Sequence, residues 1–125
     1  MTREEILNMP AGREMDRIIE KEVYGSDKLP VNYSPSTDLV WAFHTAEDIH
    51  AQIVAQGRHE ETIVNEDANY LTLTFTGQDW AASFGCIYGD DEWFEPANTH
   101  WPLVAHGETA ALAICRAALL VVDNA

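Results

Sequence analysis

The sequence has few cationic residues. It contains 7 Lys+Arg against 21 Asp+Glu, so the formal net charge is −14. A protein that binds duplex DNA or RNA presents a basic face to the phosphates. Adhesion to an anionic membrane likewise needs clustered basic residues. The composition therefore argues against a duplex nucleic acid or a membrane as the partner, and it leaves small molecules and proteins.

Long hydrophobic runs and paired cysteines are also missing. The most apolar stretch, residues 110–122, is interrupted by Arg116 and is shorter than the roughly 18–20 residues of a membrane span. Residues 1–22 carry charges throughout, unlike a signal peptide, so we expect a cytoplasmic protein. Cys86 and Cys115 form no CxxC pair and have no histidine at ligand spacing. Free buried thiols are expected, although the sequence leaves a disulfide between them open.

No motif of an enzyme is present. The chain has no nucleophile elbow, no phosphate-cradling glycine loop and no His-Glu-x-x-His. Cys115 lies in an apolar segment, where a thiol is inert. The acidic run at residues 90–95 lacks the spacing and central glycine of an EF-hand, and it reads as a solvated loop. We therefore predict a protein that is not an enzyme and that uses no cofactor and no metal.

The remaining composition suits one α+β domain over residues 1–125. The 46% hydrophobic content and twelve aromatic residues are enough for a core. Thr2 to Glu5 has the form of a capping box and predicts a first helical turn ended by Pro10. Pro10 then opens a second helix that ends at Gly25. Its apolar face consists of Met15, Ile18, Ile19 and Val23.

A long third helix is predicted from Ser34 as the N-cap to about Gly57. Its apolar stripe consists of Leu39, Val40, Phe43, Ala46, Ile49 and Ile53. Alternating residues predict an antiparallel hairpin from strands at 70–76 and 80–88, and 62–65 is a candidate short strand. Residues 89–107 are predicted to be irregular. A last helix, apolar nearly all round, runs from about 108 to 122.

Three segments together resemble the phage ABA sandwich domain family of small phage and prophage proteins. They are residues 9–16 (MPAGREMD), residues 33–38 (YSPSTD) and residues 113–119 (AICRAAL). The resemblance implies an α-β-α sandwich and an infected or lysogenic bacterial host, but it supplies no activity. Tyr88 to His106 departs from the family pattern as an inserted segment.

Four residues are candidates for a ligand site. Arg116 is the one Lys or Arg after Arg58, and a guanidinium within so apolar a helix must be paired or reach the surface. It either bonds a carboxylate or a helix terminus, or it forms an anion subsite to which Arg13 contributes. Trp93 and Trp101 lie in irregular sequence, where they pack locally, form a subunit interface or stack on a flat ligand.

Three functions compete on this evidence. The first is a non-enzymatic anti-defence sponge that sequesters a small nucleotide-type immune signal, with Arg13, Arg116, Trp93 and Trp101 as its ligand contacts. In size, phage character and site chemistry the chain is weakly similar to the Thoeris anti-defence sponges. The second is an acidic interaction module or decoy that binds a host or phage protein. The third is an accessory domain whose main property is homo-oligomerisation, and a homo-oligomer is also expected for the first.

Overall fold

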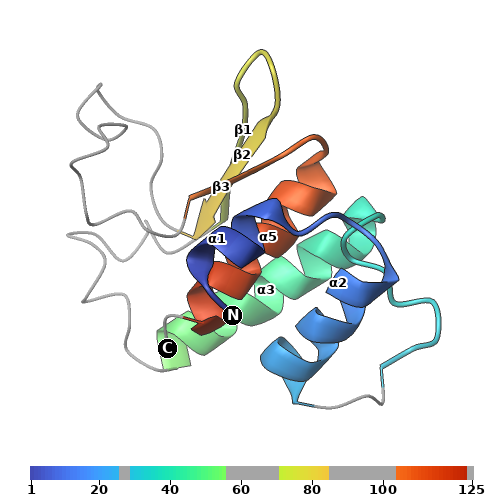
Figure 1. The fold of residues 1–125 in the computed structure, drawn as a ribbon. Helices are drawn as coiled ribbons and strands as arrows, with labels where there is room; N and C mark the ends of the chain where they lie inside the picture. The colour runs from blue at the N-terminus through green and yellow to red at the C-terminus, as the bar shows by residue number, and fades with distance from the viewer. Residues whose placement is uncertain (26–28, 56–70, 85–103, 124–125) are drawn as a thin grey trace.

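A computed structural model describes residues 1–25, 29–55, 71–84 and 104–123 (Figure 1). Its described part combines helices with a three-stranded antiparallel sheet in the order β1-β2-β3. The predicted α+β class is confirmed. No helix in these ranges is long and apolar enough to cross a bilayer.

The N-terminal region begins with two short helices. Helix α1, Arg3–Asn8, has the predicted capping box, in which Thr2 and Glu5 exchange side-chain and backbone hydrogen bonds. Helix α2, Arg13–Ile19, continues into a π-helical turn, η1, Glu20–Tyr24, and ends as predicted at Gly25 in the left-handed conformation. The predicted start at Pro10 is wrong. Gly12 is the N-cap, with a φ of 146° that favours glycine, so the chain turns into the helix three residues later.

Helix α3, Leu39–Ala55, begins later than predicted. The backbone N–H groups of Thr37 and Asp38 both donate to the Ser34 carbonyl, so the residues after Ser34 form a turn outside α3. The Asp38 carboxylate accepts the N–H of Val40 and caps the helix in place of Ser34.

The predicted apolar stripe of α3 is wrong in its first half. Leu39, Val40 and Phe43 point to solvent with exposed fractions of 42%, 65% and 42%. Ala46 and Ile49 of the predicted stripe are buried, together with Ala42 and with Thr45, whose hydroxyl bonds the helix backbone.

The predicted hairpin is confirmed over strands β1, Leu71–Phe75, and β2, Trp80–Phe84, which pair with Leu71 opposite Phe84. The prediction of irregular structure up to residue 107 is wrong at its end, where Ala105–Gly107 forms strand β3 beside β2. Three residues are too few to show an alternating pattern, and the pairing partner is distant in sequence. The candidate strand at 62–65 and the predicted extension of β2 to residue 88 lie outside the described residues.

Helix α5, Ala110–Asp123, confirms the predicted last helix and forms the centre of the core. It packs against β2 and β3 on one side and against α3 on the other (Figure 1). Gly107 allows this close approach, because a Cβ at that position would lie 2.7 Å from the backbone nitrogen of Ala113. Cys115 is buried in this helix, and burial raises the pKa of its thiol. The predicted inert character of Cys115 fits this position, whereas Cys86 lies outside the described residues.

Candidate functional site

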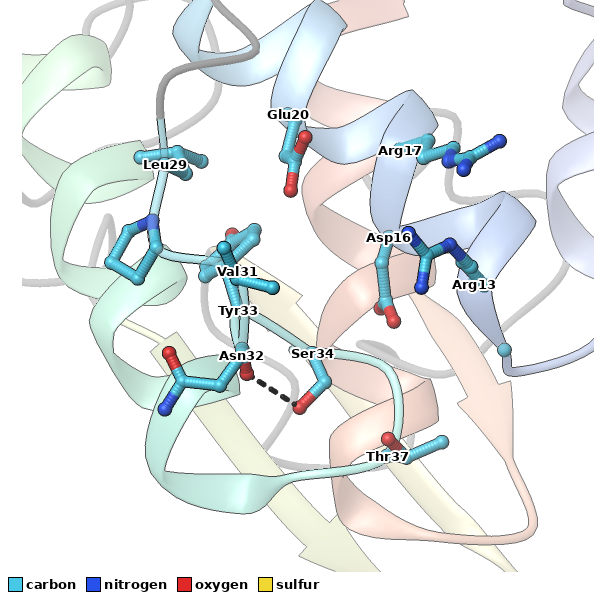
Figure 2. Close-up of a pocket in the computed structure, with 12 residues that line it drawn as sticks. Arg13, Asp16, Arg17, Glu20, Leu29, Val31, Asn32, Tyr33, Ser34 and Thr37 are labelled. Atoms are coloured by element: carbon cyan, nitrogen blue, oxygen red, sulfur yellow. Dashed lines mark hydrogen bonds between the residues drawn. The ribbon is translucent and has the colours of Figure 1, made fainter.

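A cavity of about 630 Å³ opens between the α2–η1 helix and the segment of residues 29–37 (Figure 2). Its helical side carries alternating basic and acidic side chains. The segment opposite contributes small, polar and apolar residues. The full lining is Gly12, Arg13, Asp16, Arg17, Glu20, Leu29, Pro30, Val31, Asn32, Tyr33, Ser34 and Thr37.

Ser36 fixes the two sides of this cavity to each other. Its hydroxyl accepts the Gly12 N–H at 2.9 Å and donates to the Gly12 carbonyl at 3.1 Å. Its own N–H donates to the Asp16 carboxylate at 2.9 Å, and both residues are buried. The segments 9–16 and 33–38, two of the three that carry the family resemblance, are therefore hydrogen-bonded to each other.

Arg13 and Arg17 supply positive charge to the cavity. Their spacing of four residues brings both side chains to the same side of one helix. Figure 2 shows Arg13 lying beside Asp16, whereas the Arg17 side chain extends away from the segment of residues 29–37. Both side chains are exposed, and neither forms a salt bridge or a hydrogen bond with another described residue. The two guanidinium groups therefore remain available to an anion.

Two carboxylates lie among the arginines on the helical side of the cavity, which is called the wall below. Asp16 is 7% exposed, and its Oδ1 is already engaged by the Ser36 N–H. Glu20 is half-buried and lines the same cavity one turn further along. The wall therefore offers hydrogen-bond donors and acceptors within one cavity, which suits a ligand that carries both an anionic group and N–H or O–H donors.

Tyr33 forms a rigid part of the lining. Its ring makes edge-on contacts with Tyr24 and Trp41, with centroid distances of 5.9 and 5.3 Å. Its hydroxyl is hydrogen-bonded to that of Thr45, which in turn donates to the Trp41 carbonyl. Burial raises the pKa of Tyr33, so this phenol stays protonated and serves packing rather than acid–base chemistry.

Arg116 lies at a different place from Arg13. Its Nε and Nη2 donate to the Met9 carbonyl at 3.1 and 2.8 Å, and its Nη1 donates to the His106 carbonyl at 2.7 Å. Met9 is the C-cap of α1, so Arg116 has the helix-terminus contact that the sequence left open as one alternative. Burial lowers the pKa of the guanidinium, which remains charged at neutral pH. Arg116 is not among the residues that line the cavity.

Of the four residues predicted to bind ligand, the structure thus places Arg13 in the cavity and Arg116 outside it. Trp93 and Trp101 lie outside the described residues, as does the acidic run at 90–95. Sequence reasoning missed Arg17 and Glu20, although the four-residue spacing from Arg13 and Asp16 indicates that they share its side of the helix. No cluster of three metal-ligating side chains occurs within the described ranges.

Comparisons with protein-family models, with curated proteins and with solved structures found no match for this chain.

Proposed function

We propose that this chain, a phage or prophage protein by its sequence resemblance, binds a small nucleotide-type ligand without converting it. In this role it sequesters an immune signal of the bacterial host. The observation that carries the proposal is the pair of guanidinium groups at the cavity that have no partner among the described residues. In a protein with three times as many acids as bases, carboxylates were available to neutralise them.

The chemistry of the wall favours a nucleotide over a simple anion. Arginine forks match phosphate oxygens, so Arg13 and Arg17 would hold a phosphate. The Glu20 carboxylate and the Asn32 amide would accept hydrogen bonds from an exocyclic amine or a sugar hydroxyl. A volume of about 630 Å³ lies within the usual range of small-molecule sites.

A thermal-shift screen tests the proposal directly. The probes are cyclic ADP-ribose, cyclic di-AMP, AMP and inorganic phosphate, each added in excess to the intact protein. A ligand that binds the folded state raises the melting temperature by mass action. We expect at least one nucleotide to do so and to be recovered chemically intact after the protein is denatured.

Two matched variants separate site binding from general charge effects. Arg13→Gln should weaken nucleotide binding by about tenfold or more, because charge-assisted hydrogen bonds to phosphate are lost. Arg3→Gln removes the same charge from an exposed position on α1, away from the cavity, and should bind as the parent does. If no probe shifts the melting temperature, or if both variants bind equally, the cavity is not a nucleotide site.

A further inference from the structure

The outward face of α3 carries an apolar patch over its first turns. Val40 is 65% exposed, and Leu39 and Phe43 are each 42% exposed. Their spacing places them together on one side of the helix. The adjoining side of the helix is buried against the core through Ala42 and Ile49, so the patch is fixed to a rigid element. It lies on a different element from the two that form the cavity.

The surroundings of the patch are acidic. Asp38 precedes it, Glu47 and Asp48 follow it on the same helix, and all three are exposed. Helix α3 contains no lysine and no arginine. Asp48 accepts a hydrogen bond from the Tyr24 hydroxyl at 2.6 Å, which holds one of these charges in place.

These charges decide which occupant fits. A second copy of the chain would bring two acid-rimmed patches together, each on a molecule with a net charge of −14. A helix with leucine-like residues on one face and lysine or arginine on its flanks complements both the apolar centre and the acidic rim. We propose that α3 is a docking surface for a basic amphipathic helix of a partner protein.

The test uses a synthetic helical peptide of leucine and lysine as the probe, with binding followed by fluorescence anisotropy on the intact protein. We expect Val40→Ser to weaken binding about tenfold, since it replaces the most exposed apolar side chain of the patch. Phe75→Ser is the control, because it replaces an exposed apolar side chain on β1, which belongs neither to the patch nor to the cavity lining. Glu47→Gln should also weaken binding and reduce its dependence on salt.

One peptide control and one measurement of assembly complete the design. A peptide of the same composition, scrambled so that its leucines do not share a face, should bind at least tenfold more weakly. Equal binding of the two peptides, or equal binding by the Val40→Ser and Phe75→Ser variants, overturns the proposal in favour of charge attraction alone. Concentration-dependent dimerisation that Val40→Ser abolishes would overturn it in favour of a second copy. None of these results depends on nucleotide binding at Arg13.

Discussion

Arg116 offers the strongest single test of how this fold is held together. Its guanidinium bonds the carbonyls of Met9 and His106, and thereby joins α5 to the end of α1 and to β3. Arg116→Met keeps the length and the apolar stem of the side chain but leaves both carbonyls without these donors. A hydrogen bond to a charged group contributes roughly 1.5–3 kcal/mol.

Because two of the donors share one acceptor and the group is partly exposed, we expect a loss of about 3 kcal/mol in the free energy of unfolding. That loss is a large fraction of the stability of a small domain, and it corresponds to a fall of about 10 °C in melting temperature. Arg116→Lys keeps the charge, but its ammonium lacks the planar fork, so we expect about half of this loss.

Urea denaturation followed by circular dichroism measures these values, with Arg3→Met as the matched control for charge. A loss below about 0.5 kcal/mol for Arg116→Met, equal to that of the exposed control, would refute the reasoning. Nucleotide binding by the folded Arg116→Met variant adds a second readout. It should equal that of the parent protein, because Arg116 lies outside the cavity. Loss of binding without loss of stability would instead favour the anion subsite considered in the sequence.

Three further predictions concern other parts of the structure. Gly107→Ala should destabilise the protein by about 2 kcal/mol or more in urea denaturation, because its Cβ has no room against the α5 backbone. In a Cys86→Ser background, Cys115 should not react with a thiol reagent until urea unfolds the protein, since its thiol is buried and its pKa is raised. The hydrogen bond from Thr76, and then that from His106, lowers the pKa of the Asp79 carboxyl below 3.8. Stability from this group is therefore present above pH 3.8 and lost as the pH falls through the lower native value, and Thr76→Val should raise that pKa in an NMR titration.

The local features of this fold could be predicted from the sequence. The capping box at Thr2, the helix stop at Gly25 and the alternation in β1 and β2 each depend on a few neighbouring residues. Strand β3 could not be predicted, because three residues carry no period and its stability comes from pairing with a distant strand.

The side of α3 that faces the core shows a second limit of prediction from the sequence. Its first large apolar residues were predicted to be buried, yet the close approach of α5 selects the side that carries Ala42 and Thr45 beside Ala46. Small side chains permit that approach, and hydrophobicity alone does not reveal it. Thr45 is buried there because its hydroxyl finds partners in Tyr33 and in the helix backbone.

The candidate site was predictable in part. Arg13 stands out by its place at the start of a helix, and Arg17 follows from the helical repeat. The contact of Arg116 with a helix terminus was one of the predicted alternatives, but the two carbonyls that it bonds could not be predicted, because backbone acceptors carry no residue-type signal. Trp93 and Trp101 stay predictions.

The contact between Arg116 and Met9 also has a consequence for the order of folding. It spans 107 residues, and the amino group of Met1 lies 3.7 Å from the carboxylate of Asp123. Closing so long a loop has a high entropic cost, so we expect α1 to dock after α5 has packed on the sheet. Weakening this contact should then accelerate unfolding and leave the folding rate nearly unchanged. We therefore expect the release of α1 to be the first step by which the native state opens.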